Sequence, residues 1–305
     1  MRRVLQRFFL FLLVLLPVGS LFIGVPEVLA SKRQVPDSPM ELKVMTYNLR
    51  GYDYFDASPH SWGERRPVIR KIIQEERPDI FGTQEAVYKQ IRDIIADLPQ
   101  YAWIGLGRDG GSKGQHVAIF YNQNRFSPIE YNHFWLSDTP NVVASKSWGN
   151  NLPRMVTWVK FLDNKTKQQF YFINTHLDHA SEEAREKSAA LIVEKVKEFD
   201  PSLPILLTGD FNASPNSKPH QILTTSGAFV DLWGVAKARI NEGLGTFNGF
   251  RDPDGAGAEH RIDWILAKGN VAVEMIEILN FQKNGQYPSD HYPVIAQVRL
   301  HAGNN

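Results

Sequence analysis

Residues 205–212 read Ile-Leu-Leu-Thr-Gly-Asp-Phe-Asn. An apolar run of this length predicts a β-strand, and Gly209 ends it just before two short polar side chains, Asp210 and Asn212. Polar residues at a strand end stand on a rigid scaffold, where they can meet side chains from neighbouring strands. This stretch therefore predicts one edge of a functional site.

The same pattern, a short apolar run followed by polar side chains, recurs along the chain. The runs are rich in β-branched and aromatic residues, as strands are. We expect strands at Leu42–Asn48, Asp79–Thr83, Val117–Tyr121, Val156–Leu162, Phe170–Thr175, Ile205–Gly209, Ile262–Leu266 and Val294–Leu300. The polar residues that we place at strand ends are Asn48, Glu85, His176, Asp178, Asp210, Asn212, Asp263, Asp290 and His291.

Three amphipathic helices are expected between these strands. Apolar residues repeat at helical spacing in residues 68–73, 87–98 and 191–199. Pro67 precedes the first pattern and suits a first helical turn, while Glu182 and Glu183 open the third helix near the positive end of its dipole. Strands and helices that alternate only partly favour an α+β fold, in which helices cover sheets whose inner faces pack together.

Composition limits the class of protein. Of the 305 residues, 43% are hydrophobic and 22% are charged, which excludes disordered, collagenous and coiled-coil chains. No internal repeat is visible, so we expect a single catalytic domain over residues 41–302. Cysteine is absent, which excludes thiol nucleophiles, thiolate zinc sites and iron–sulfur clusters. Any metal must therefore be bound by oxygen or imidazole.

Residues 1–30 predict a signal peptide. Three arginines precede the uncharged apolar run that begins at Phe8, and the segment ends in the small residue Ala30. We expect cleavage after Ala30, a leader over residues 31–40, and an exported protein, periplasmic or extracellular, without stable membrane contact. The alternative is an uncleaved membrane anchor, because the run from Phe8 to Pro26 is about long enough to span a bilayer.

The charge balance weighs against a nucleic-acid partner without excluding one. Lysine and arginine number 34 and aspartate and glutamate 33, for a formal net charge of +1. A non-specific nuclease is expected to show a track rich in lysine and arginine. The basic cluster Arg65, Arg66, Arg70 and Lys71 lies on the first expected helix, and we interpret it as a solvated face.

The chemistry of the strand-end residues points to a hard cation. Carboxylates and amides without cysteine are the ligands of Mg²⁺ or Mn²⁺. Such an ion polarises a phosphoryl oxygen and stabilises a leaving oxyanion. Each motif alone also fits a turn or a helix cap. Only the motifs taken together indicate a metal site. The set favours hydrolysis of a phosphoester.

Six motifs occur in a defined order along the chain. They are Asn48, Gln84-Glu85, His176, Gly209-Asp210-Phe211-Asn212, Asp263 and Ser289-Asp290-His291. This ordered set, within residues 45–293, resembles the endonuclease/exonuclease/phosphatase superfamily, which includes exonuclease III and DNase I. Residues 134–148 are similar to the deadenylase/nocturnin-like bacterial branch, and their aromatics either stack on a base or sugar or pack in the core. The resemblance implies a four-layer α/β sandwich of two facing mixed β-sheets flanked by helices.

The resemblance also implies residue roles. Water attacks phosphorus in line, and Asp210 activates or orients that water. Asp263 and His291 act as a pair, in which the carboxylate fixes the imidazole tautomer and the imidazole contacts the phosphoryl oxygen or acts as an acid or base. Asn212 holds the phosphate or the attacking water, and His176 contacts the phosphate. The implied ligands of Mg²⁺, or Mn²⁺, are Glu85, Asn48 and Asp290.

Two further residues are candidates for substrate binding. Arg154 precedes a strand, where its guanidinium can fork onto a phosphate, and a surface ion pair is the alternative. Asp178 fits a site or a loop equally well. The glycine-rich segment 105–111 lacks the lysine-serine pair of a phosphate-binding loop, so we interpret it as a flexible loop at the pocket rim.

These observations favour an exported, divalent-metal-dependent phosphoesterase. Its expected substrate is a phosphate mono- or diester, namely a small phosphorylated metabolite, sugar phosphate or nucleotide. One alternative is a secreted nuclease that acts on DNA or RNA, and another is a catalytically silent binding protein of the same fold. A sphingomyelinase ranks lower, because no long apolar loop suited to a bilayer is visible. We expect a monomer.

Overall fold

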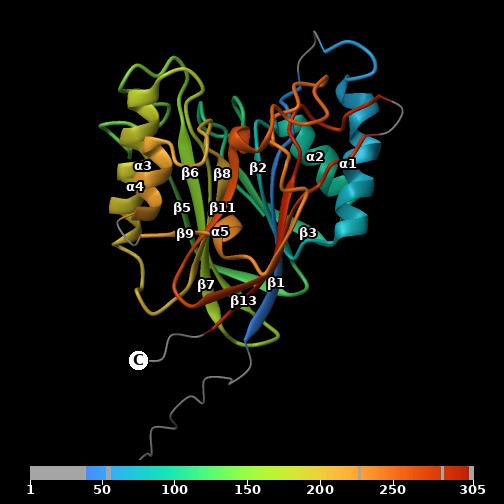
Figure 1. The fold of residues 1–305 in the computed structure, drawn as a ribbon. Coiled ribbons are helices and arrows are strands. Elements are labelled where there is room, and N and C mark those ends of the chain that lie inside the picture. The colour runs from blue at the N-terminus through green and yellow to red at the C-terminus, as the bar shows by residue number, and fades with distance from the viewer. Residues whose placement is uncertain (1–38, 53–55, 226–227, 283–284, 302–305) are drawn as a thin grey trace, which may run out of the picture. The chain divides into compact units, whose positions relative to one another are not determined.

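Two β-sheets face each other, and helices cover their outer faces (Figure 1). The computed structural model describes residues 39–301, apart from 53–55, 226–227 and 283–284. The predicted signal peptide and most of the predicted leader lie outside the described residues. From β1 onward these residues fall within one compact unit, Val35–Asn305. No helix among them has both the length and the apolar character needed to cross a bilayer.

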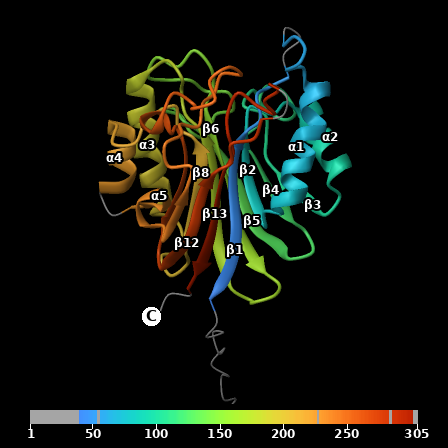
Figure 2. The ribbon, with the colours of Figure 1, turned by 45° about the vertical axis from the view of Figure 1, so that its right-hand side comes forward.

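The first sheet has seven strands, with β1 near its centre. β1 pairs in parallel with β2 and antiparallel with β13. In spatial order the strands are β10 (Ala238–Ile240), β12 (Val271–Ile278), β13 (Val294–Leu300), β1 (Met40–Asn48), β2 (Ile80–Gln84), β4 (Ala118–Asn122) and β3 (Tyr101–Ile104). Its outer face is covered by α1 (Trp62–Glu76) and α2 (Tyr88–Asp97) (Figure 2).

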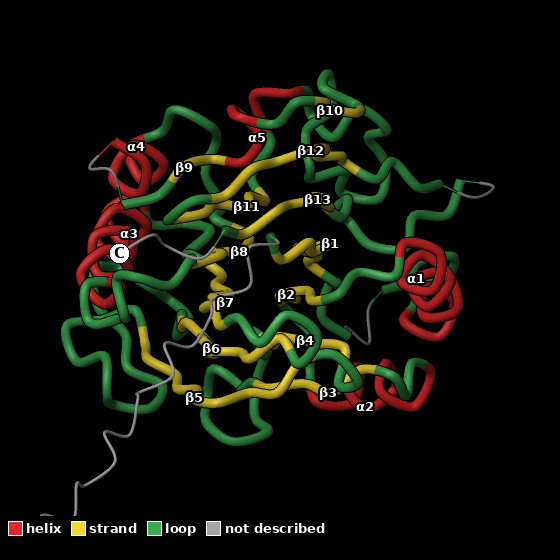
Figure 3. Tube along the Cα trace, turned by 90° about the horizontal axis from the view of Figure 1, so that it is seen from below, coloured by secondary structure: helices red, strands yellow, loops and turns green. Residues whose placement is uncertain are grey.

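The second sheet has six strands and is also mixed. β7 and β8 are parallel, and β11 runs antiparallel to β8. In spatial order the strands are β5 (Phe126–Trp135), β6 (Met155–Asp163), β7 (Gln169–His176), β8 (Ile205–Asp210), β11 (Asp263–Lys268) and β9 (Val230–Asp231). Helices α3 (Glu182–Val196) and α4 (Lys218–Thr225) lie against its outer face (Figure 3). The short α5 (Leu232–Val235) follows β9, and a 3₁₀ helix spans Ala258–His260.

Four apolar clusters of the described residues hold the layers together. One lies between the sheets and includes Phe161 and Phe172 from the second sheet and Val44 from the first. Two lie under the helices, with Ile192 of α3 in one and Ile73 of α1 in the other. The fourth is small and is formed by Val117, Trp135 and Met155. This arrangement confirms the predicted four-layer sandwich of two facing mixed sheets. Each helix buries one apolar stripe and each sheet buries both faces, as such layers require.

A polar contact joins the two sheets near the ends of β2 and β7. Gln84 Nε2 donates to Asn174 Oδ1 at 2.7 Å, and Asn174 Nδ2 donates to the carbonyl of Thr83 at 2.8 Å. Gly82 lies in the same place, where an added Cβ would collide with the side chains of Asn174 and Thr208. The sheets therefore approach closely beneath the strand ends, and these hydrogen bonds fix their spacing.

Helix α1 differs from the sequence expectation in two ways. It begins at Trp62, so Pro67 is its sixth residue and not part of the first turn. The N–H that proline lacks would have bonded the carbonyl of Gly63, which is exposed and can be solvated instead. The interpretation of Arg65 as part of a solvated face is also wrong, because its side chain is fully buried.

Arg65 is buried because backbone carbonyls surround it. It donates to the carbonyls of Leu49 (2.8 Å), Pro288 (3.0 Å), His60 (2.8 Å) and Arg50 (3.1 Å). Its guanidinium therefore joins the loop after β1 to the loop before Asp290. A charge can be buried in this way when every donor finds an acceptor.

Several strands are absent from the sequence expectation. The predicted strands recover the centres of both sheets, whereas β3, β5, β9, β10 and β12 were not predicted. β5 lies at the edge of its sheet and exposes residues 129–132, so its apolar period is weak. In the third helical pattern, Phe199 lies beyond the end of α3 at Val196.

Candidate active site

The polar strand ends meet at one edge of the sandwich. Asn48 and Asp210 are the last residues of β1 and β8, and His176 ends β7 opposite Asp210. Asp263 begins its strand, but β11 is antiparallel to β8, so Asp263 also pairs with Asp210. His291 precedes β13 and lies beside this group. Residues separated by more than 200 positions are thus brought into contact.

Asn48 lies at the centre of the group. Its Nδ2 donates to Glu85 Oε1 at 3.1 Å and to Asp210 Oδ2 at 2.9 Å, and lies 3.4 Å from His291 Nε2. The side chain is fully buried. Because Asn48 and Glu85 come from one sheet and Asp210 from the other, this amide fixes the spacing of the two carboxylates.

Asp263 and His291 form a buried pair. Asp263 Oδ2 is 2.9 Å from His291 Nδ1, while His291 Nε2 is 3.8 Å from Asp210 Oδ2. Burial alone would lower the pKa of His291, but the charges of Asp263 and Asp210 raise it to about 10. The contact at Nδ1 fixes the orientation of the ring. Nε2 is therefore held toward Asp210 and Asn48.

Asp210 and its neighbours form the other half of the group. Burial and then the charge of Asp263 raise the pKa of Asp210 to about 7. Asp210 Oδ1 accepts from the backbone N–H of Asn212 at 2.9 Å, and Asn212 Nδ2 is 3.0 Å from His176 Nε2. Burial and the charge of Arg154 hold the pKa of His176 well below its ordinary value.

Two of these residues have a left-handed backbone. Glu85 has a φ of 67° and Asn212 a φ of 47°. Asparagine adopts this conformation readily, whereas glutamate does so at a cost of order 1–3 kcal/mol. The backbone of Glu85 accepts this strain in a position where its carboxylate reaches Asn48 and the N–H of Gly51.

The donor set fits a divalent cation. Four carboxylates gather here, and Asp263 Oδ1 is buried without a hydrogen-bond partner. Burial raises the pKa of Asp290, and the charge of Glu85 contributes to that rise. Ligand atoms of Glu85, His176 and Asp210 lie within 4.8 Å of one another, as do those of Asp210, Asp263 and His291. An oxygen-rich site with excess negative charge suits Mg²⁺ or Mn²⁺.

Arg154 and Asp178 lie beside this group. Arg154 is buried, and its Nε is 3.5 Å from Asp178 Oδ2, so a surface ion pair is excluded. Asp178 Oδ1 accepts from the backbone N–H groups of Ala180 and Ser181, which open α3. The carboxylate of Asp178 therefore caps a loop and holds Arg154 in place.

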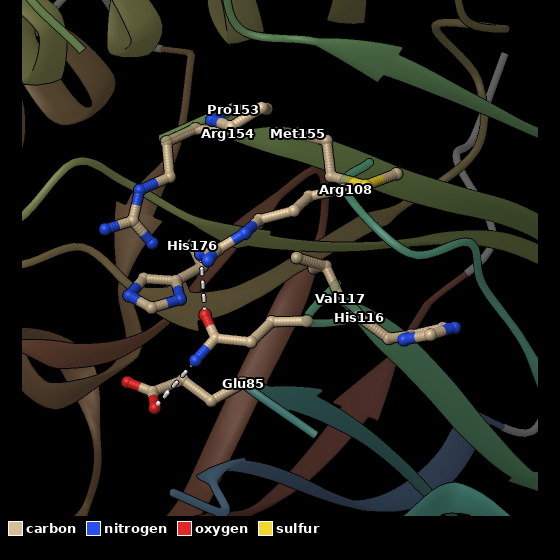
Figure 4. Close-up of a pocket in the computed structure, with 9 residues that line it drawn as sticks. Glu85, Arg108, His116, Val117, Pro153, Arg154, Met155 and His176 are labelled. Carbon is tan, nitrogen blue, oxygen red and sulfur yellow. Dashed lines mark hydrogen bonds between the residues drawn. The ribbon is translucent and has the colours of Figure 1, made fainter. Parts of the chain in front are cut away.

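A small cavity next to His176 contains a residue that sequence reasoning missed. The cavity, of about 10 Å³, is lined by Glu85, Arg108, Gln115, His116, Val117, Pro153, Arg154, Met155 and His176 (Figure 4). Arg108 Nη1 donates to Gln115 Oε1 at 2.7 Å, and Gln115 Nε2 donates to Glu85 Oε2 at 3.3 Å. Both guanidinium groups, of Arg108 and Arg154, are directed toward His176 in this view.

Arg108 belongs to the glycine-rich segment that was interpreted as flexible. The segment does line the pocket, but backbone hydrogen bonds from Arg108 to Gln115 and from Gly107 to Gly111 hold it. Trp135 Nε1 also donates to the carbonyl of Arg108. Of the aromatics in residues 134–148, Phe134 and Trp135 are buried, which favours packing over stacking on a substrate.

Sequence comparison assigns this constellation to a family. The profile of the endonuclease/exonuclease/phosphatase family matches residues 45–291, which include Asn48 and His291. The chain belongs to that family. It is therefore a metal-dependent hydrolase of phosphoester bonds, a class that includes phosphatases and nucleases, and the resemblance seen in the sequence is confirmed at this level.

Solved structures agree with this assignment. A mannosyl-6-phosphatase of Bacteroides thetaiotaomicron is 39% identical, with a TM-score of 0.80 over 84% of this chain and 99% of that one. Another family protein of the same organism is 38% identical, with a TM-score of 0.81 over 87% and 99%. The catalytic domain of human nocturnin, 18% identical with a TM-score of 0.66 over 86% and 93%, shares the fold.

Proposed function

We propose that this protein is an exported phosphatase that hydrolyses monoesters of phosphate with small sugars, with the aid of Mg²⁺ or Mn²⁺. The observation that carries the proposal is the pair of largely buried guanidinium groups, Arg108 and Arg154, beside the carboxylate group. The amino-terminal pattern of residues 1–30 supports export. The similarity to a mannosyl-6-phosphatase supports a sugar phosphate as the substrate.

The two arginines favour a monoester over a diester. A phosphate monoester carries a charge of about −1.5 to −2 at neutral pH, whereas a diester carries only one negative charge. Asp178 partly balances Arg154, while Arg108 Nε is buried without a hydrogen-bond partner and lies 4.0 Å from Asp109 Oδ2. Burial and the charge of Arg154 lower the pKa of Arg108, as expected of two neighbouring cations. A phosphoryl group with two negative charges would pair with both guanidinium groups.

The shape of the cavity supports the same choice. Val117, Pro153 and Met155 are among its lining residues, and its volume admits about one water molecule. A space of this size has no room for a further nucleotide. A substrate whose phosphate is terminal suits this geometry better than a phosphodiester within a polymer.

Each residue of the site then has its own role in the hydrolysis. Asp210 accepts a proton from the attacking water, and the amide of Asn212 holds a phosphoryl oxygen close to it. The His291 imidazolium, oriented by Asp263, donates to a second phosphoryl oxygen. As the new bond to phosphorus forms, the bond to the sugar oxygen breaks. That oxygen takes a proton from water, and the products are the free sugar and inorganic phosphate. Glu85, Asn48 and Asp290 would hold the divalent cation, which would stabilise negative charge at the phosphoryl group. His176 remains neutral and contacts the phosphate without competing for the proton.

Steady-state kinetics test the proposal. Phosphate release from mannose 6-phosphate is compared with cleavage of bis(p-nitrophenyl) phosphate and of RNA, in Mg²⁺ and in EDTA. We expect chelator-sensitive kcat/KM to be highest for the monoester. Arg108→Met and Arg154→Met should each lower that value about 10- to 100-fold, since each removes a charged hydrogen bond. Arg92→Met, at an exposed arginine of α2, is the matched control. Faster cleavage of the diester or RNA would overturn the proposal.

A further inference from the structure

An exposed aromatic side chain lies against the proposed catalytic imidazole. Phe247 is 44% exposed, and its ring centroid is 5.1 Å from that of His291, with the two planes at 67°. Scattered exposed apolar residues need no explanation in a folded protein. Among the large exposed apolar side chains of the described residues, however, Phe247 is the one with a ring contact to the residues gathered at the strand ends.

The backbone of Phe247 is held firmly on one side. Phe247 and His291 form an isolated antiparallel bridge. Next to it, the N–H of Tyr292 donates to the carbonyl of Thr246 at 2.7 Å. Thr246 Oγ1 in turn accepts from the backbone N–H of Asp263 at 3.1 Å. Thr246, the residue before Phe247, is thus attached to Asp263 and to Tyr292, which follows His291 in the chain.

The other side of Phe247 is held as well. The N–H groups of Asn248 and Gly249 both donate to the carbonyl of Asp290, at 2.8 and 3.0 Å. Gly249 has a φ of 56°, and a Cβ there would lie 3.5 Å from the Phe247 ring. A glycine at this position leaves the flank of the ring free. The exposure of Phe247 is therefore a property of a fixed backbone and not of a loose loop.

A fixed, half-exposed ring beside a phosphate site is suited to bind the rest of the substrate. Burial of its exposed face by a ligand is favourable, and rigidity keeps the entropic cost low. Since the ring contacts His291, whatever covers it must lie close to the phosphorus. In a hexose 6-phosphate a single methylene separates the ester oxygen from the sugar ring, so this ring lies within reach of Phe247. In a nucleoside 5′-phosphate the ribose lies equally close, while the base lies a whole ribose farther away.

We propose that Phe247 is the sugar-binding platform of this site. The apolar C–H face of a hexose packs on its ring when the 6-phosphate lies between His291 and the Arg108–Arg154 pair. This inference rests on the proposed function and extends it to a specificity-determining residue. Discrimination between a hexose phosphate and an acyclic phosphate of similar charge then comes from Phe247.

The kinetic test compares two substrates in each variant. The ratio of kcat/KM for mannose 6-phosphate to that for glycerol 3-phosphate should fall about tenfold in Phe247→Ala, because loss of an aromatic contact weakens binding by about that factor. The change should appear mainly in KM for the sugar phosphate. Phe247→Tyr should restore the ratio. Tyr131→Ala, at a 58% exposed aromatic of β5, is the control that leaves it unchanged. An unchanged ratio in Phe247→Ala overturns the proposal.

A binding measurement separates this inference from the proposed function. Saturation-transfer difference NMR of mannose 6-phosphate should show saturation of the sugar ring protons with the wild-type protein, and its loss with Phe247→Ala. Saturation of the sugar ring protons without hydrolysis of any monoester would support sugar binding by Phe247 and refute the proposed activity. Hydrolysis without ring saturation would refute the platform alone.

Discussion

Replacement of Arg65 by methionine should destabilise the protein by about 2–6 kcal/mol. Of its four acceptors, the carbonyls of Leu49 and Pro288 are in fully buried hydrogen bonds, while those of His60 and Arg50 are partly accessible. A buried acceptor left without a partner costs about 1–3 kcal/mol, and the two buried carbonyls give the range. Methionine keeps much of the apolar stem, so lost packing adds little.

Equilibrium urea unfolding measures this difference. The control is Arg66→Met, one residue along α1, where the guanidinium forms partly exposed ion pairs with Asp93 and Asp97. That variant should lose less than about 1 kcal/mol. If the Arg65 and Arg66 variants lose the same free energy of unfolding, the loss of a positive charge explains the effect. The explanation by unpaired buried carbonyls would then be refuted.

Three further predictions concern the site, the acid limit and the sheet spacing. Asp263→Asn should lower kcat/KM by about 10²–10⁴-fold, because His291 loses the carboxylate that orients and charges it; steady-state kinetics would measure this loss. Burial works against the charged form of Asp163, but its hydrogen bond with Arg125 holds its pKa below the ordinary 3.8. The stabilisation is thus present above that pH and lost as pH falls through the folded pKa. Asp163→Asn should therefore be less stable than wild type in urea at neutral pH, and the two should converge in acid. Gly82→Ala should cost at least about 1–3 kcal/mol in the same assay, because the added methyl group meets the facing sheet.

The sequence predicts which polar side chains converge where these residues stand at strand ends. Asn48, Asp210 and His176 each end a strand whose apolar run is visible, and the parallel or antiparallel pairing of these strands brings them together. The centres of both sheets follow from the same runs. The edge strand β5 and the short strands do not, because exposed residues interrupt their pattern.

Arg65, Arg108 and Phe247 could not be found in this way. The acceptors of Arg65 lie as far as 223 residues away in the chain, and nothing local distinguishes it from the solvated Arg66 beside it. Arg108 and Phe247 lie in irregular segments without periodicity. Their roles depend on which strand end each segment meets, and this is set by tertiary packing alone.

One measurement tests the central claim most directly. Phosphate release from mannose 6-phosphate is followed for the wild-type protein and for Asp210→Asn, in EDTA and after addition of Mg²⁺, with urea unfolding as a check on the fold. We predict turnover that EDTA abolishes and Mg²⁺ restores in the wild type, and a loss of about 10²–10⁴-fold in a stably folded Asp210→Asn protein. Turnover that resists EDTA, or an Asp210→Asn protein that works at the wild-type rate, would contradict the account.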